Sequence, residues 1–286
     1  MINHLQLLLL GAIAGFTIFL GLPLALMQDV SARKKGFLNA IAIGILVFLI
    51  IDVFSHAWNT ASTTAYNAFM GRAPVIDGVS DLIAVFGGIA IGLLGLVIYE
   101  ARYMTGPVKP QTTSESSSAP SSSGLLQQTQ LLKVSAYKLA MMIAIGIGAH
   151  NFSEGLAIGQ SYAAGSIGLA LILIVGFGAH NATEGFGIAS PLTRLTNRPS
   201  LRFLVTAGLI GGGPTFLGTL VGSLIGVSEF TYVLFLSIAG GALVYVSMLM
   251  YNSGRMQTNN RILMLGIFVG LSVGLLTDLI VTLGGA

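Results

Sequence analysis

The chain has 286 residues, of which 54% are hydrophobic and only 8% charged, and its mean hydropathy is +0.86. A water-soluble domain carries about a quarter charged residues, so this composition excludes one and predicts an integral membrane protein. Cysteine is absent, which excludes disulfides and thiolate metal ligands. The formal net charge of +3 is small, so the position of the charges is more informative than their sum.

Apolar runs long enough to cross a bilayer, at roughly 20 residues per crossing, recur along the chain. The first run resembles a signal peptide in position, but it is long enough to span, so we expect a helix bent at Pro23. We expect eight transmembrane helices in one compact all-α bundle, a single domain over residues 1–286. The predicted helices cover about residues 5–27, 37–58, 81–101, 134–158, 167–190, 202–226, 230–251 and 262–284.

Residues 102–132 differ from the rest in composition. They contain Pro107, Pro110 and Pro120, together with the Ser-rich stretch 114–123. Such a segment cannot bury a core, so it is predicted to be a flexible linker. The fourth and fifth apolar runs, in contrast, are separated only by a short Gly/Ser/Ala turn and should form an antiparallel hairpin.

The basic residues provide an independent test of the helix count. If the N-terminus is outside, twelve of the thirteen Lys and Arg residues fall on the cytoplasmic side, and only Arg72 does not. The positive-inside rule then places both termini outside and the 102–132 linker in the cytoplasm. The twelve residues are Arg33, Lys34, Lys35, Arg102, Lys109, Lys133, Lys138, Arg194, Arg198, Arg202, Arg255 and Arg261.

A ten-residue stretch occurs twice. Residues 146–155 read GIGAHNFSEG and residues 176–185 read GFGAHNATEG, with seven of the ten positions identical. Each copy contains His-Asn-x-x-Glu, and because residues i and i+4 share a helix face, each His lies one turn from its Glu. The polar residues are His150, Asn151 and Glu154 in the first copy and His180, Asn181 and Glu184 in the second.

The hairpin should bring these side chains to one depth in the membrane. A turn near Gly165–Ser166 places Glu154 level with His180, and His150 level with Glu184. Ionisable groups in hydrocarbon are costly unless they pair, meet water or bind a cation, and imidazole with carboxylate suits a borderline divalent metal such as zinc. We therefore predict an intramembrane metal site flanked by the two asparagines; the alternative is His–Glu pairs that only hold two helices together.

Eight helices, a polar loop after the third, and His-Asn-x-x-Glu-Gly followed by His-x-x-x-Glu-Gly together resemble the ZIP (Zrt- and Irt-like) family of divalent metal transporters. The topology covers essentially the whole chain, and the motif covers residues 146–189. The resemblance implies that helices one, four, five and six move against the others. It also implies a main transport site formed by His150, Glu154, His180 and Glu184. Asn151 and Asn181, with the same two glutamates as bridges, fall where some relatives bind a second metal.

The chain departs from the family pattern in three places. Ser153 and Thr183 stand where the family's helix four and often its helix five have proline. In helix six many relatives carry a Glu just before a Pro, whereas here Gly213 precedes Pro214. If that alignment holds, one ligand of a second site is missing, so one-metal and two-metal sites both remain open.

Asp52, His56 and Asp278 are further ionisable residues within the predicted helices. Asp52 and His56 repeat the i, i+4 spacing near the outer end of helix two, and His56 is either a metal ligand at the entrance or an interfacial residue capping a loop. Asp278 in helix eight either lines the transport path or hydrogen-bonds a neighbouring helix.

The predicted function is transport of a divalent cation, zinc first but with iron, manganese and others open, into the cytoplasm. The alternatives are an intramembrane metallohydrolase with a His/Glu-bound zinc and a non-transporting receptor or structural bundle. We predict no enzyme, no catalytic residues and no catalytic cofactor, because the metal is the transported substrate. Metal ions and the lipid bilayer are the expected partners, nucleic acid is not, and a homodimer is the oligomer to test. The expected location is the cell membrane, with several crossings.

Overall fold

The computed structural model describes residues 3–27, 31–104, 122–195, 197–225, 227–255 and 258–283, and all regular structure within them is helical. Eight helical segments of this part of the chain are long and apolar enough to cross a membrane, which confirms the predicted all-α architecture. The helices are α1 (His4–Phe16), α2 (Ala32–Phe69), α3 (Val75–Tyr99), α4 (Ser122–Ala163), α5 (Ile167–Ala189), α6 (Leu201–Leu224), α7 (Glu229–Arg255) and α8 (Asn260–Leu283).

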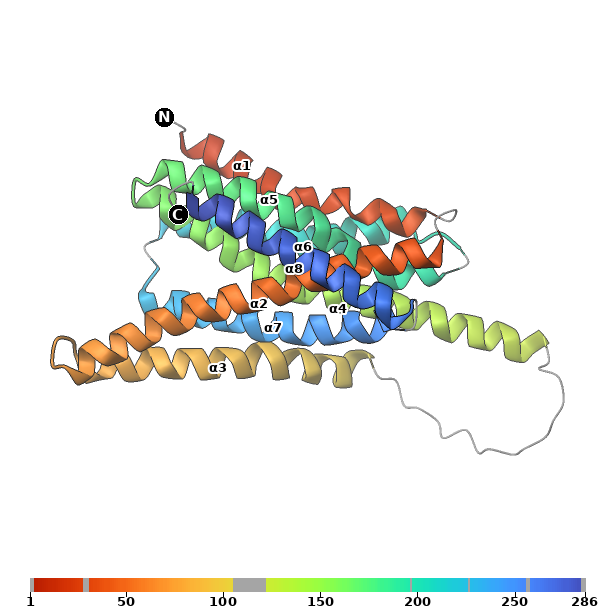
Figure 1. Ribbon diagram of the computed structural model, residues 1–286, viewed down its shortest axis with the longest axis horizontal. Coiled ribbons are helices and arrows are strands. Elements are labelled where there is room, and N and C mark those ends of the chain that lie inside the picture. The colour runs from red at the N-terminus through yellow and green to blue at the C-terminus, as the bar shows by residue number, and fades with distance from the viewer. Residues whose placement is uncertain are drawn as a thin grey trace.

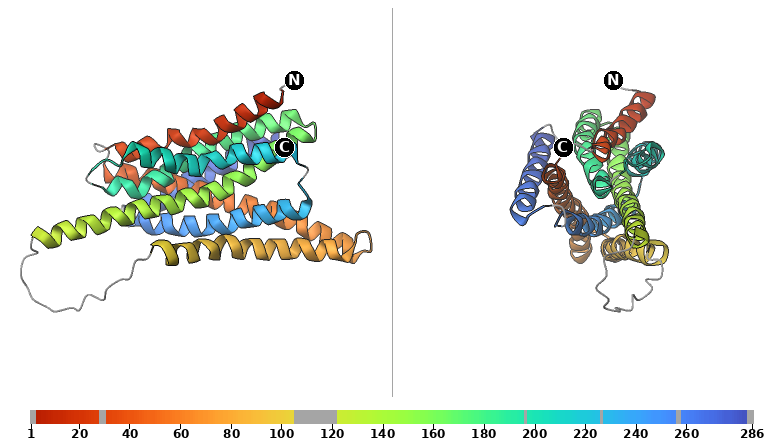
Figure 2. Two further views of the ribbon diagram at one scale, coloured as in Figure 1. Left: turned by 180° about the vertical axis from the view of Figure 1, so that it is seen from behind. Right: turned by 90° about the vertical axis from the view of Figure 1, so that its right-hand side faces the viewer.

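Successive helices run in opposite directions along one bundle, and both ends of the chain lie at the same end of it (Figure 1). The helices form two groups, which are seen end-on in the right-hand view of Figure 2. The first group contains α1, α4, α5 and α6, and the second contains α2, α3, α7 and α8. The most extensive pairings, α4 with α6, α3 with α7 and α2 with α8, all fall within a group.

Glycine allows helices of the same group to touch backbone to backbone. A Cβ atom on Gly15 would collide with the carbonyl oxygen of Gly212, and one on Gly155 would collide with that of Thr215, so α1 and α4 both lie directly on α6. Gly44 of α2 meets the α8 backbone in the same way. Such contacts are typical of membrane helices, in which small residues permit close packing.

Contacts between the two groups are of a different kind. A Cβ atom on Gly146 of α4 would meet the side chain of Val246, and one on Gly187 of α5 would meet the end of the Met250 side chain. Side chains can change rotamer and repack, whereas a backbone contact cannot yield without moving a helix. At these two positions the boundary between the groups is therefore more adaptable than a backbone contact.

Several helix limits differ from those predicted. α2 continues to Phe69, about three turns past the predicted residue 58, because Ala61 and Ala65 keep a small-residue face that packs on α3. Residues 122–132 begin α4, although they were assigned to the linker. From Leu125 on, a Leu/Gln-rich sequence without Gly or Pro follows, and Leu and Gln are good helix formers. The rest of the predicted linker, residues 105–121, lies outside the described residues.

The first helix bends earlier than expected. α1 gives way at Thr17 to two short 3₁₀ helices, Thr17–Leu20 and Leu22–Leu26, so the change begins before Pro23. The Thr17 hydroxyl donates to the carbonyl of Ala14 at 2.7 Å. In the tighter winding Gly21 lies against the α5 backbone, so the bend fits α1 to its neighbour.

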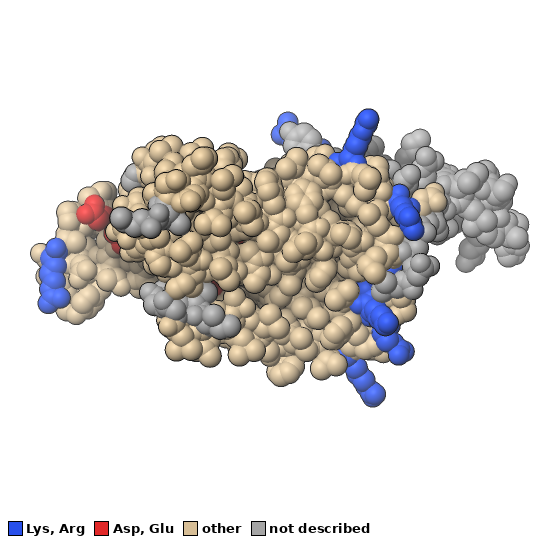
Figure 3. All heavy atoms as spheres, turned by 90° about the horizontal axis from the view of Figure 1, so that it is seen from above, with Lys and Arg blue, Asp and Glu red and all other residues tan. Residues whose placement is uncertain are grey.

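Charge divides the bundle into two unlike ends. Exposed Lys and Arg side chains gather at the end where α2, α6 and α8 begin, which we call the basic end (Figure 3). Among the residues that the structure describes, Arg72, in the turn between α2 and α3, is the only Lys or Arg at the opposite end. The largest apolar core, which includes Leu46, Ile143 and Leu243, fills the bundle on the basic side of the repeated motif.

Candidate metal site

The α4–α5 hairpin brings the two copies of the motif together. Its turn contains Gly165, whose φ of +79° is a conformation that glycine adopts without strain. The hairpin places Glu154 of α4 level with His180 of α5, and Glu154 Oε1 lies 2.5 Å from His180 Nε2. The same oxygen lies 3.0 Å from Nε2 of His150, one turn away on its own helix.

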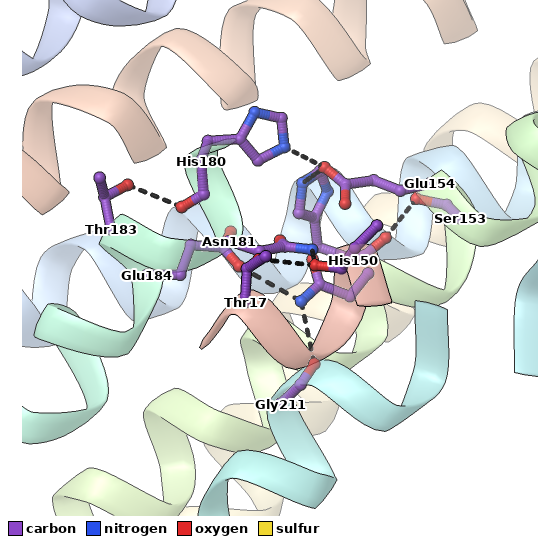
Figure 4. A network of polar contacts seen from close by, with 11 residues as sticks. Thr17, His150, Ser153, Glu154, His180, Asn181, Thr183, Glu184 and Gly211 are labelled. Atoms are coloured by element: carbon purple, nitrogen blue, oxygen red, sulfur yellow. Dashed lines mark hydrogen bonds and ion pairs between the residues drawn. The ribbon is translucent and has the colours of Figure 1, made fainter. Parts of the chain in front are cut away.

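His150, Glu154 and His180 form the centre of the site (Figure 4). One ligand atom from each lies within 4.8 Å of the other two, and all three side chains are at least nine-tenths buried. Two imidazole nitrogens and a carboxylate oxygen converging at this distance are the donor types and the spacing that a borderline divalent cation requires.

Glu184 lies close by but outside this group of three. Its Oε2 accepts a hydrogen bond from Asn151 Nδ2 at 3.2 Å, and the same amide donates to the Gly211 carbonyl of α6 at 2.9 Å. Among the described residues Glu184 forms no ion pair with either histidine. Three of the four predicted ligands, His150, Glu154 and His180, therefore lie together. Glu184 lies beside them and is hydrogen-bonded to Asn151.

The asparagines point their nitrogens at the protein and leave their oxygens free. Asn181 Nδ2 donates to the Ala14 carbonyl at 3.1 Å. Within the described residues, ten buried side-chain nitrogen and oxygen atoms have no hydrogen-bond partner. Four of them are oxygens of the predicted site, namely Asn151 Oδ1, Glu154 Oε2, Asn181 Oδ1 and Glu184 Oε1.

These free oxygens argue for a bound cation. Each unsatisfied buried acceptor costs about 1–3 kcal/mol, and four acceptors without donors in one place cannot satisfy one another. Their concentration beside the histidine pair is what an oxygen-binding cation would explain. The donor set therefore fits a metal ion better than it fits a purely structural His–Glu contact.

A hydroxyl side chain lies three residues after the histidine in both motif helices. Ser153 Oγ donates to the His150 carbonyl at 2.7 Å, and Thr183 Oγ1 donates to the His180 carbonyl at 2.7 Å. Such back-bonding competes with the helix ladder and bends helices slightly. Each hydroxyl acts on the carbonyl of a candidate ligand, so these residues fix the local backbone from which the imidazoles project.

α6 approaches the site through residues other than Gly213. A side chain at position 213 would meet no atom within 4 Å, and this position is one turn from exposed Leu209 and Leu217. A side chain at this position would therefore lie on the same side of α6 as these exposed leucines. α6 instead contributes the Gly211 carbonyl, and buried Thr215 carries a hydroxyl without a partner. Neither residue was predicted, because neither belongs to the repeated motif.

A cavity of about 450 Å³ connects the site to the end of the bundle opposite the basic end. Its walls include the three residues whose roles the sequence did not decide, namely Asp52, His56 and Asp278. Asp52 Oδ1 and His56 Nε2 are 3.5 Å apart. Gln160 and Thr282, near the last turns of α4 and α8, extend the walls outward. The site can thus be reached from one end of the bundle, while the apolar core fills the other side.

The fold and the site define a polytopic membrane protein with a buried polar centre that is reached from one end and whose side chains are of the types that ligate metal ions. The family model described as ZIP zinc transporter matches residues 5–277, and the chain belongs to this family. It is therefore an integral, multi-pass membrane protein that transports divalent metal ions. None of the curated proteins matches it. No finding supports the alternative of an intramembrane metallohydrolase.

Proposed function

We propose that the chain carries Zn²⁺, or a divalent transition metal of similar preference, into the cytoplasm through a site formed by His150, Glu154 and His180. Glu184 and the oxygens of Asn151 and Asn181 complete the coordination or hold a second ion. The observation that carries this proposal is the convergence of the three buried ligand atoms within 4.8 Å, beside four unpartnered oxygens.

The chemistry of the donors supports zinc over calcium or magnesium. Ca²⁺ and Mg²⁺ prefer shells composed of oxygen, whereas imidazole nitrogen suits Zn²⁺, Fe²⁺, Co²⁺ and Ni²⁺. Without a thiolate, the site has no ligand that would favour a soft ion over these. Competition between these metals in an uptake assay measures the order of preference among them.

The direction follows from charge and from the cavity. The positive-inside rule assigns the basic end to the cytoplasm, so the cavity opens to the outside and the ion arrives along Asp278, Asp52 and His56. The three proposed central ligands belong to α4 and α5, and the opposite walls of the cavity belong to α2, α7 and α8. Movement of the first helix group against the second, across their side-chain boundary, would close the cavity and open the basic side.

The test is zinc uptake by proteoliposomes containing the Glu154→Ala variant. We expect saturable uptake to fall to background, because Glu154 Oε1 is shared by both imidazoles. Glu229→Ala is the matched control, since Glu229 is an exposed glutamate outside the cavity, and it should transport normally.

The Asn181→Ala variant tests whether the site binds one metal ion or two. If one ion bound by the central three residues is sufficient, this variant should lose less uptake than Glu154→Ala. Equal loss in the two variants would argue for a two-metal centre. Near-normal saturable uptake by folded Glu154→Ala protein would overturn the site assignment itself.

A further inference from the structure

A second groove, separate from the metal path, lies at the basic end between the first turns of α2 and α8. Its volume is about 450 Å³. We call it the basic-end groove. The residues that line it are Arg33, Lys34, Phe37, Leu38, Ile262 and Leu265.

The groove lies where α2 and α8 diverge. The two helices touch closely at Gly266 and Gly270 of α8, farther from the basic end than the groove. A Cβ atom on Gly266 would collide with the side chain of Ala40, and one on Gly270 would collide with the carbonyl oxygen of Ile41. From this contact toward their first residues the helices leave an open wedge with apolar walls. Leu265 is 56% exposed in that wall, so the groove offers apolar surface at the depth where a transmembrane helix meets lipid.

The rim of the groove is positively charged. Arg33 and Lys34 are both exposed, and so is Arg261, which precedes a lining residue on α8. The N-terminal ends of α2 and α8, which carry partial positive charge, lie at this same end (Figures 1 and 3). No acidic residue lines the groove; Asp29, the nearest in sequence, lies outside the described residues.

We propose that the basic-end groove binds one anionic phospholipid. Its acyl chain lies against Phe37, Leu38, Ile262 and Leu265, and its phosphate is bound by Arg33 and Lys34. A free phosphate would leave the apolar walls uncovered, and a zwitterionic lipid would bring a cationic headgroup to a cationic rim. Basic clusters beside membrane helices attract anionic headgroups through the same charge complementarity. With the basic end in the cytoplasm, the lipid belongs to the inner leaflet.

The test uses tryptophan fluorescence in vesicles of defined lipid. Trp58 is the only tryptophan, so Leu265→Trp in a Trp58→Phe background reports on the groove alone. Quenching by brominated phosphatidylglycerol should show binding on the order of tenfold stronger than that of brominated phosphatidylcholine. Val205→Trp in the same background is the comparison, because Val205 is a half-exposed residue of α6 away from the groove; it should show no such preference.

Charge removal tests the role of the rim. The double variant Arg33→Gln, Lys34→Gln should abolish the preference at Leu265→Trp. The double variant Arg198→Gln, Arg202→Gln removes the same charge from exposed residues outside the groove and should leave it intact. A preference that survives the first change, or that disappears with the second, would overturn the proposal.

Two measurements cover the remaining outcomes. Millimolar inorganic phosphate should not relieve the quenching, and relief would assign the site to free phosphate instead of lipid. Native mass spectrometry of the unmodified protein should show one retained phosphatidylglycerol in preference to phosphatidylcholine. Equal retention of both lipids would contradict the proposal, whether or not the variants fold.

Discussion

At the scale of single residues, Glu154 is the carboxylate that both histidines of the site share. Its Oε1 serves both histidines, at 3.0 Å and 2.5 Å, while its Oε2 has no partner. A buried carboxylate is tolerated only when paired, and removing one partner of a buried pair costs about 3–5 kcal/mol. The paired arrangement of Glu154 with the two histidines therefore stabilises the buried carboxylate.

Acid should weaken equilibrium metal binding. Histidine has an ordinary pKa of about 6.5, and a protonated imidazole cannot ligate a metal, so protons compete with the ion for His150 and His180. We expect affinity for zinc to fall more than about tenfold between about pH 7 and about pH 5. Calorimetry on purified protein measures this without the complication of proton-coupled movement. Affinity that is flat over this range would mean that imidazole is not a ligand.

The sequence predicted the central residues of the site because they form a repeated motif at helical spacing. It did not predict that Glu184 stands apart, since helical depth says which residues are level but not which way a side chain turns. It also missed Thr215 and the Gly211 carbonyl. A backbone carbonyl has no sequence signal, and a single threonine in an apolar helix resembles any other.

At the scale of helices, the α4–α6 contact should tolerate no added methyl group. Gly155→Ala would place a Cβ against the backbone carbonyl of Thr215, so overpacking should cost about 1–3 kcal/mol and lower the unfolding temperature in detergent. Gly168→Ala on α5 is the matched control, because a Cβ there meets nothing within 4 Å. An unfolding temperature that is equal in the two variants would contradict the proposed rigidity of this contact.

Deletion of residues 112–121 should leave both stability and maximal uptake nearly unchanged. The deleted part is rich in Ser and contains Pro but no His, and it ends just before α4 begins at Ser122. A polar segment of this composition has no apolar face to pack. Thermal unfolding and zinc uptake are the two measurements, and a large fall in either would show that the segment packs on the bundle or takes part in transport.

Helix limits were the weakest part of the sequence prediction. Hydropathy marks where a helix lies in lipid, but α2 continues past that limit because alanines on one face pack against α3 near Gly78. The start of α4 was missed for another reason, because helix-forming residues follow a serine-rich stretch there. Apolar length alone cannot detect helix that is stabilised outside the membrane.

At the scale of the whole molecule, the cavity predicts which positions are reached from outside. The chain has no cysteine, so single cysteines need no altered background. Thr277→Cys, in the cavity wall, should react with a membrane-impermeant thiol reagent added outside. Ala144→Cys, fully buried on the basic side of the site, should be protected. The opposite pattern would reverse the proposed orientation or the side from which the site opens.

The hairpin of α2 and α3 reaches beyond the other helices at the end opposite the basic end (Figure 1). Between Gly44, where α2 meets α8, and Phe69, α2 is one stiff rod. If the second helix group rotates by about 5° against the first, about a point level with Gly44, the tip of α2 moves through roughly 3 Å, given a rise of about 1.5 Å per residue. The tip of α2 therefore moves farther than the rest of its group for the same rotation. The distance between a spin label at Phe69 and one on α5 would report small angular changes between the two helix groups.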